Sequence, residues 1–253
     1  MTENTVRAVE RALDILLCFS RQTPELTMSE ISLKVDIHKS TVHRILATLE
    51  EKQFVERDKT TGAYRLGINM LHMAYLTLEQ NDLRRISHPF LQILKDQFRE
   101  TVNLSILDNA DMVYLDVLES PQRVKLAAAI GQRLPAFCTA SGKVLLAYSS
   151  ADVVQEVLSQ GMPRHTEDTI TSQKKFNELL IQIRERGYAF SIQEFEVGIN
   201  AVAAPIIDKN NIPVGSIAVA GPSFRFTETL MNEIGPSLMN TAREIAQELE
   251  FVQ

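Results

Sequence analysis

The chain has 253 residues, of which 45% are hydrophobic and 23% charged, an ordinary globular composition with length enough for about two domains. No run of about 18 apolar residues is present, and the N-terminus lacks the basic head and apolar core of a secretory signal, so no membrane span or export is expected. The net charge of −6 argues against a protein that coats nucleic acid through bulk positive charge. We therefore expect a cytoplasmic protein whose two cysteines, Cys18 and Cys138, are reduced thiols.

The negative charge belongs to the second part of the chain. Residues 1–67 contain ten Lys or Arg and ten Asp or Glu, whereas the remaining residues contain 16 basic and 22 acidic ones. A neutral first part with a local basic strip can still bind DNA, because a few aimed contacts then supply the affinity.

Two helices are predicted at the start of the chain. Apolar residues recur at helical spacing from Val6 to Leu17, which predicts an amphipathic helix over residues 5–20. Thr27 and Glu30 then form the capping pattern that opens a second helix.

A third helix, predicted over residues 38–52, has an apolar face for packing and a polar face of small and basic side chains. Its N-terminus favours phosphate, and an arginine one turn further on can contact guanine. Residues 54–57 and 63–66 predict two short strands joined by a polar turn, which completes a winged helix-turn-helix. The candidate DNA contacts are His38, Lys39, Ser40, Thr41, His43 and Arg44 on the helix, and Lys59 and Arg65 on the wing.

The alternative for this region is a small helical bundle whose polar face is merely solvated. The added hairpin argues against it, as does the scarcity of acidic residues on the exposed face of the third helix before Glu50.

The rest of the chain predicts a linker helix and a mixed domain. Residues 68–81 form an apolar helical stretch, which needs either a partner chain or burial against its own chain. Strands grouped with helices at their flanks predict an α+β fold. The predicted strands are 102–107, 112–118, 125–129, 188–192, 201–207 and 214–220, and the predicted helices are 83–100, 139–148, 151–159, 172–186 and 227–250.

The run SEISLKVDIHKSTVHRILATLEEKQFVERDKTTGAYRLG resembles the winged helix of IclR-type transcriptional regulators, and VRAVERALDILLCF resembles their first helix. Asp36 departs from the family, which usually has glycine in this turn; aspartate tolerates the left-handed conformation better than most residues. The runs LPAFCTASGKVLLA and GINAVAAPIIDKNNIPVGSIAVAGPSFRF resemble the effector-binding domain of the same family, a GAF/PAS-like sheet.

The resemblance implies three parts and an assembly. The parts are a winged helix-turn-helix at 1–67, a linker helix at 68–81 and an effector-binding domain at 82–253. The linker helix would help to pair the DNA-binding heads of a homodimer, and two such dimers would form a tetramer on double-stranded operator DNA.

A small organic acid is the expected effector. Ala140, Ser141 and Gly142 open a helix with small side chains, so that its backbone N–H groups can approach a carboxylate. The resemblance implies that these backbone positions hold the acid. By motif matching, further lining positions fall at Ser191, Ala201, Ala218 and Ala220.

The resemblance also bears on the size of that acid. Family members that take very small oxo acids carry Cys and Ser at the last three positions, where this chain has alanine. This substitution favours a larger acid, such as a sugar-derived or aromatic one, although the alanines could instead simply pack the sheet.

Catalysis is not expected. A P-loop reading of Ser141-Gly142-Lys143 fails because Phe137 and Val144 stand where glycine and a hydroxyl residue are required. Cys138 has no evident base, and no Cys/His cluster has metal-ligand spacing, so neither metal nor cofactor is expected. The sequence thus predicts a DNA-binding repressor of a catabolic operon; the alternatives are an activator of the same architecture and a small-molecule sensor or enzyme with a helical head.

Overall fold

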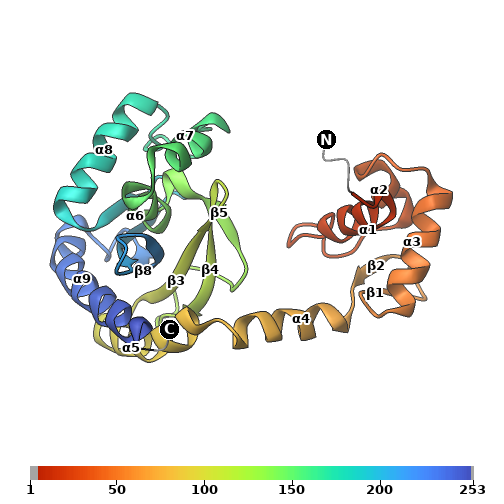
Figure 1. Cartoon of the computed structure of the whole chain (residues 1–253), viewed down its shortest axis with the longest axis horizontal. Coiled ribbons are helices and arrows are strands. Elements are labelled where there is room, and N and C mark those ends of the chain that lie inside the picture. Colours follow the sequence, from red (N-terminus) through yellow and green to blue (C-terminus); the bar gives the residue numbers. More distant parts are fainter. Residues whose placement is uncertain (1–4, 252–253) are drawn as a thin grey trace. The chain divides into compact units, whose positions relative to one another are not determined.

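The computed structural model describes residues 5–251, which divide into two compact units between Gln80 and Asn81. The first unit consists of helices and a two-stranded hairpin, and the second is a six-stranded antiparallel sheet with helices on both faces (Figure 1). The predicted α+β fold class is therefore confirmed. Over residues 5–251, none of the helices combines the length and apolar character that a membrane span requires.

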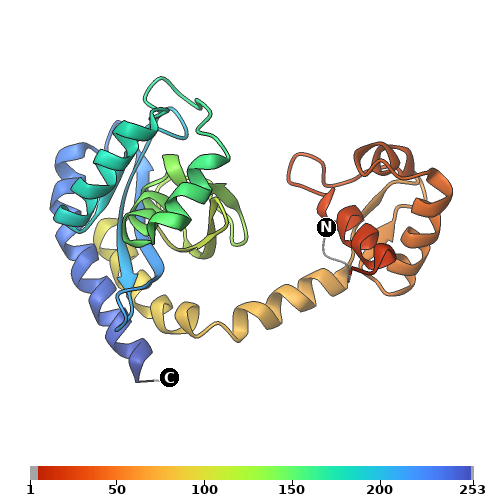
Figure 2. The same ribbon diagram turned by 45° about the horizontal axis from the view of Figure 1, so that its top comes forward.

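The first unit is built around a small core shared by its helices and its hairpin. Figure 2 shows the red to orange helices α1, α2 and α3 gathered together. The core side chains are Ile15, Leu26, Ile31, Val42, Leu46, Leu49, Val55 and Tyr64. The elements are α1 (Arg7–Leu17), α2 (Met28–Lys34), α3 (Lys39–Glu51), β1 (Val55–Arg57), β2 (Tyr64–Leu66) and α4 (Ile68–Glu79).

Local sequence signals set the starts of α2 and α3. Thr27 and Glu30 form a full capping box, in which each side chain bonds the other residue's backbone N–H. His38 caps α3, since its Nδ1 accepts a hydrogen bond from the backbone N–H of Ser40. The intervening Asp36 has a φ of 50°, the left-handed conformation expected for this turn.

Hydrogen bonds join the start of α4 to the residues that directly follow α3. The N–H of Gly67 donates to the carbonyl of Phe54, and the side-chain amide of Asn69 donates to the carbonyl of Lys52. A Cβ at Gly67 would lie 2.2 Å from the carbonyl oxygen of Gln53, so only glycine allows this approach.

Two helices of the first unit carry apolar side chains that this chain does not cover. On α1 the side that includes Val9, Leu13 and Leu17 is more than half exposed, and Ile15 is the fully buried residue. The helix is amphipathic as predicted, but most of its apolar face points to solvent. Within α4 none of the residues is buried, and Ile68, Leu71, Met73 and Tyr75 are also more than half exposed.

The second unit is a sheet of strand order β5-β4-β3-β8-β7-β6, with every neighbouring pair antiparallel. Its strands are β3 (Thr101–Asp108), β4 (Asp111–Leu118), β5 (Arg133–Pro135), β6 (Ala189–Ile192), β7 (Ile199–Ile207) and β8 (Pro213–Pro222). Its helices are α5 (Asp82–Phe98), the 3-10 turn η1 (Ala136–Cys138), α6 (Ala140–Tyr148), α7 (Ala151–Ser159), α8 (Gln173–Arg186) and α9 (Glu228–Glu250).

Alternation along the strands divides the core of this unit into two layers. Side chains such as Val102, Leu104 and Val219 pack against α5 and α9 on one face. The opposite face carries small side chains, among them Ala203 and Ala218, which pack against α6 and α8. Small residues on this second face let α6 lie close to the sheet, and the candidate pocket lies on this side.

The strand predicted over residues 125–129 is wrong. That segment is irregular, and the outer edge of β4 pairs instead with the three-residue β5. Arg133 fixes this pairing, because its guanidinium contacts both Asp108 and Asp111 at the ends of β3 and β4. Residues 125–129 pair with none of the strands, so their apolar run does not form one.

Candidate functional site

The exposed surface of the N-terminal half of α3 is basic. Lys39, His43 and Arg44 are exposed, whereas Thr41 is half-buried. The ion pairs described in this unit join Lys52 to Glu51 and Arg65 to Glu56. The positive charges of Lys39 and Arg44 are therefore uncompensated within residues 5–251, as a phosphate-binding surface requires.

Two of the predicted contact residues already hold the start of α3. The Nδ1 of His38 lies 2.9 Å from the Oγ of Ser40 and 3.3 Å from its backbone nitrogen. These bonds fix both side chains at the helix N-terminus, where the unpaired backbone N–H groups also favour an anion.

The wing is the hairpin formed by β1 and β2. Asp58 accepts hydrogen bonds from the backbone N–H groups of Thr60 and Thr61, which orders the turn and lowers the pKa of its carboxyl. Lys59 is exposed at this turn. Arg65 instead lies opposite Glu56 and forms an ion pair with it at 3.1 Å, so part of its charge is already compensated.

A groove between α1 and α3 adds two basic residues that sequence reasoning missed. Arg7 and Arg11 line it together with Arg44, Thr41 and Thr48. Arg7 and Arg11 are four residues apart, so they share one face of α1. That spacing was visible in the sequence, but only the packing of α1 on α3 shows that it adjoins the basic face of α3.

The second unit contains a largely apolar pocket at the N-terminal end of α6. Its volume, counted as the space open to the centres of water molecules, is about 70 Å³. Its walls are Asn103, Met112, Tyr114, Leu126, Ala127, Gln132, Leu134, Thr139, Ala140, Ser141, Ser191, Phe195, Glu196, Ile199, Ala201, Ala218 and Ala220.

The start of α6 supplies the anion-binding groups of this pocket. Thr139 caps the helix, and its Oγ1 accepts from the N–H of Gly142 while donating to the carbonyl of Pro135. Ala140 and Ser141 line the cavity, and the N–H groups of a first helical turn have no intrahelical partner.

Gly142 has a packing role rather than a lining one. It is absent from the walls described above, and a Cβ there would lie 2.3 Å from the Cα and carbonyl oxygen of Ala136. It therefore lets α6 sit against the preceding turn. Sequence reasoning placed Gly142 in the pocket because it adjoins the residues that do line it.

The sheet contributes a row of small residues to the floor. Register pairs Ser191 with Ala201, and Ala201 with Ala220, across β6, β7 and β8. Ala218 lies two residues along β8 and faces the same side. The Oγ of Ser191 donates to the carbonyl of Cys138 at 3.0 Å, which ties this end of the row to the start of α6.

Two family profiles match this chain. A family profile described as IclR helix-turn-helix domain matches residues 8–59, and one described as Bacterial transcriptional regulator IclR C-terminal matches residues 75–247. The chain belongs to the IclR family of transcriptional regulators.

Relatives match this IclR-family chain along nearly its whole length. The HTH-type transcriptional regulator KdgR of Escherichia coli is 30% identical over 98% of this chain and 94% of its own length. The transcriptional repressor IclR of the same species is 29% identical over 95% of this chain and 89% of its own length. The crystal structure of an IclR transcriptional regulator from Alicyclobacillus acidocaldarius covers 96% of this chain and 99% of that chain, with a TM-score of 0.86 at 26% identity.

In this IclR-family member the pocket includes polar groups that sequence reasoning missed. Asn103 on β3 and Tyr114 on β4 are only 2% and 4% exposed, and Glu196 stands in the segment between β6 and β7. Burial raises the pKa of the Tyr114 hydroxyl to about 12, with a smaller contribution from the charge of Glu196. A strand pattern gives the face of such residues, but only the order of strands shows that they adjoin α6.

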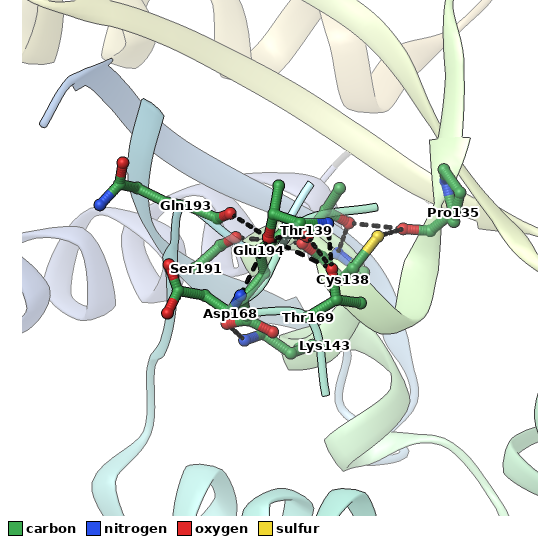
Figure 3. Close-up of polar contacts among 11 residues, drawn as sticks. Pro135, Cys138, Thr139, Lys143, Asp168, Thr169, Ser191, Gln193 and Glu194 are labelled. Carbon is green, nitrogen blue, oxygen red and sulfur yellow. Dashed lines mark hydrogen bonds and ion pairs between the residues drawn. The ribbon is translucent and has the colours of Figure 1, made fainter. Parts of the chain in front are cut away.

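A buried ion pair lies behind this site (Figure 3). Lys143 on α6 contacts Glu194, which precedes the pocket residues Phe195 and Glu196 in the β6–β7 segment. Burial lowers the pKa of Lys143 and raises that of Glu194, in each case outweighing the attraction between the two charges. Thr169 also donates to the carbonyl of Glu194. These contacts hold the β6–β7 segment against α6.

The structure gives no support to a nucleophilic role for Cys138. Its thiol is buried, donates to the carbonyl of Pro135, and has its pKa raised to about 12, chiefly by burial. His165 packs between the rings of Phe137 and Phe195 at 5.9 and 5.2 Å. Among residues 5–251, moreover, His, Cys, Asp and Glu side chains form no group of three that could hold a metal ion. The matched relatives are transcriptional regulators rather than enzymes.

Proposed function

We propose that this chain is a repressor that binds operator DNA through α3 and the wing and leaves it when an organic acid occupies the pocket of the second unit. The uncompensated basic face of α3 carries this proposal. In the major groove Arg44 reads a base while Lys39, Ser40, Thr41 and the first turn of α3 contact phosphates. His38, His43, Lys59 and Arg65 complete the predicted contacts, and binding to DNA makes the cytoplasm the place of action.

Arg7 and Arg11 extend the same surface. Because they line one groove with Arg44, they supply phosphate contacts beside the recognition helix. Such contacts add affinity without sequence preference. A variant of Arg7 or Arg11 should therefore weaken binding to all DNA sequences alike, whereas a variant of Arg44 should also relax the preference at one base pair.

The second element of the proposal is a homodimer, paired further into a dimer of dimers. The exposed apolar faces of α1 and α4 support the pairing of two first units, since exposed apolar surface of this extent marks an interaction site. Two recognition helices related by a two-fold axis require a near-palindromic operator with half-sites about one helical turn apart.

The effector that we propose is an organic acid larger than a two- or three-carbon oxo acid. Its carboxylate meets the start of α6, and its body fills the space left by Ala201, Ala218 and Ala220. The alanines support this size because all three line the cavity, and their methyl groups occupy less of it than the Cys and Ser side chains of the family members that take very small oxo acids.

DNA selection tests the first element. The full-length protein is incubated with random duplexes at about physiological salt, and the retained DNA is sequenced. Enrichment of a near-palindrome supports the proposal, and its absence, repeated with pooled organic acids, contradicts it. Arg44→Ala should weaken binding to the selected site by about 5- to 150-fold and relax preference at one base pair, because a base contact contributes about 1–3 kcal/mol. Arg123→Ala, an exposed arginine of the second unit, is the matched control.

The direction of regulation, repression or activation, and the size of the effector are tested in separate experiments. Repression predicts that transcription beside the selected site rises when the gene is removed, whereas a fall would show activation. Calorimetric titration compares glyoxylate and pyruvate with acids of five or more carbons. Tight and specific binding of glyoxylate or pyruvate would contradict the size argument.

A further inference from the structure

The two faces of the wing carry different pairs of side chains. Register across β1 and β2 places Arg57 opposite Tyr64, and Glu56 opposite Arg65. Since neighbouring residues of a strand point to opposite faces, the two pairs lie on opposite sides of the hairpin. Tyr64 is only 4% exposed and belongs to the core of the first unit. Arg57 therefore lies at the margin of that core, while Glu56 and Arg65 face solvent.

The charge of Arg65 is compensated within the wing. Its Nε and Nη2 both donate to the Oε2 of Glu56, at 3.2 and 3.1 Å. Both side chains are more than half exposed, so the pair adds little stability. A phosphate that approaches Arg65 must nevertheless displace Glu56 or lie close to its negative charge, and either event weakens the contact.

The guanidinium of Arg57 is both unpaired and held in place. Its Cζ lies 5.6 Å from the centroid of the Tyr64 ring, within the range of a cation–π contact. Its Nη2 lies 3.5 Å from the position that a Cβ on Gly62 would take, so the side chain extends along the hairpin as far as the turn. The ion pairs of the first unit, as described over residues 5–80, do not include Arg57. A side chain held in this way loses less freedom when it binds.

The turn at residues 58–63 adds a second cation to this end of the wing. Lys59 is exposed there and takes part in none of the ion pairs found in the described part of this unit. The acidic residue of the turn is Asp58, whose carboxylate accepts hydrogen bonds from two backbone N–H groups of the turn itself. The positive charges of Arg57 and Lys59 are therefore the ones that this end of the wing offers to a ligand.

A DNA duplex limits where these cations can bind. A helix of about 10–12 Å diameter fills the major groove, which is about 12 Å wide, so a hairpin beside α3 meets the phosphates and the adjoining minor groove. In A/T-rich DNA the minor groove is narrow and its negative potential is enhanced, which favours an inserted arginine. Lysine is more strongly hydrated than the planar guanidinium, so it enters such a groove less readily.

We propose that Arg57 is a specificity-determining residue of DNA binding, which inserts into the minor groove next to the site of α3 and favours A/T pairs there. This inference rests on the proposed binding of α3 in the major groove. Lys59 contacts a phosphate and adds affinity for every sequence, whereas Arg65 binds DNA only as far as Glu56 releases it. The operator accordingly has two kinds of preferred positions, those read by α3 and an A/T-rich flank set by Arg57.

The test repeats the selection of random duplexes with full-length variants. The unaltered protein should enrich A/T pairs beside the core sequence read by α3. Arg57→Ala should keep the core but lose this flanking preference, and it should bind the selected duplex about tenfold more weakly. Arg57→Lys, which keeps the charge but not the planar group, should also lose most of the preference. Arg44→Ala should show the reverse, with a relaxed core and an unchanged flank.

Arg65 and Glu56 supply the matched controls. Arg65→Ala should change the affinity for the selected duplex by less than about twofold, and Glu56→Gln should strengthen binding by about threefold, because it releases Arg65 and removes a negative charge. Each lost cation contact reduces the steepness of log K against log salt by about 0.9, so Arg57→Ala should reduce it and Arg65→Ala should not. A larger loss of affinity in Arg65→Ala than in Arg57→Ala would overturn the assignment. The unfolding temperature of each variant without DNA checks that it folds.

The outcomes separate this inference from the proposed function. If a core is enriched without A/T pairs beside it, or if those pairs persist in Arg57→Ala, the role of Arg57 is refuted and DNA binding by α3 stands. If the unaltered protein enriches no sequence, with or without pooled organic acids, both are refuted.

Discussion

Removing the ammonium of Lys143 should make the stability of the second unit strongly dependent on pH. The variant Lys143→Met keeps the length and most of the volume of the side chain but leaves Glu194 buried without its counter-ion, and the Oε2 of Glu194 already has no partner within residues 5–251. A buried carboxyl in this position escapes the cost of its charge by binding a proton, which raises its pKa.

The magnitude follows from the protonation of Glu194. Its ordinary pKa is 4.5, and each pH unit above that value costs about 1.4 kcal/mol to keep the carboxyl neutral. At pH 7 the penalty relative to the unaltered chain is therefore at most about 3.4 kcal/mol, since burial already raises the pKa of Glu194 in the presence of Lys143. At pH 5 it should fall to about 0.7 kcal/mol. This direction is the one expected for a carboxyl whose pKa is higher in the folded state than in the unfolded state. The variant keeps its stability below pH 4.5 and loses it as the pH rises.

Urea unfolding of the full-length protein, followed by circular dichroism at pH 5, 6 and 7, measures this difference from the unaltered chain. The control is the double variant Lys143→Met with Glu194→Gln, which removes both charges and should recover most of the loss at pH 7 without the pH dependence. A loss that is the same at pH 5 and pH 7 would show that Lys143 acts through packing alone, and the reasoning from charge would be refuted.

Three further predictions concern single features of the two units. Thr27→Ala removes the capping box of α2 and should cost about 1 kcal/mol, seen as a lower unfolding temperature of the first unit; no change would mean that Glu30 caps alone. Gly142→Ala places a Cβ 2.3 Å from the backbone of Ala136, so it should displace α6 and abolish acid binding measured by calorimetry, whereas normal affinity would show that the helix can shift freely. Above pH 9 the second unit should lose stability as pH rises toward 12, by up to about 1.4 kcal/mol per pH unit for each group, because unfolding releases the protons of Cys138 and Tyr114 at their lower ordinary pKa values. Stability that stays constant between pH 9 and pH 11 in urea titrations would contradict those raised pKa values.

The sequence predicted the features that neighbouring residues determine. The capping box at Thr27 and Glu30, the left-handed turn at Asp36 and the extent of α3 all follow from interactions within a few residues, and the structure has each of them. The family motifs also predicted Ala140 and Ser141 at the pocket, and both residues line it.

Features that depend on distant pairing were not predictable in this way. The strand at Arg133–Pro135 exists because β4 has a free edge there, and residues 125–129 have no such neighbour. Lys143 and Glu194 are 51 residues apart, and nothing local to either residue indicates the other. Likewise Asn103 enters the pocket only because β8 lies between β3 and β7.

The clamp between α3 and α4 has a mechanical consequence. Since Gly67 and Asn69 donate hydrogen bonds to the carbonyls of Phe54 and Lys52, just after α3, the start of α4 is fixed to the end of α3 although the hairpin separates them in sequence. When the far end of α4 rotates, α3 should therefore rotate with it, because these hydrogen bonds resist bending between the two helices. Joining residues 1–80 to a foreign sensor in helical phase with α4 should make DNA binding respond to that sensor. Inserting one residue, which turns the helix by about 100°, should disconnect the response while leaving both parts folded.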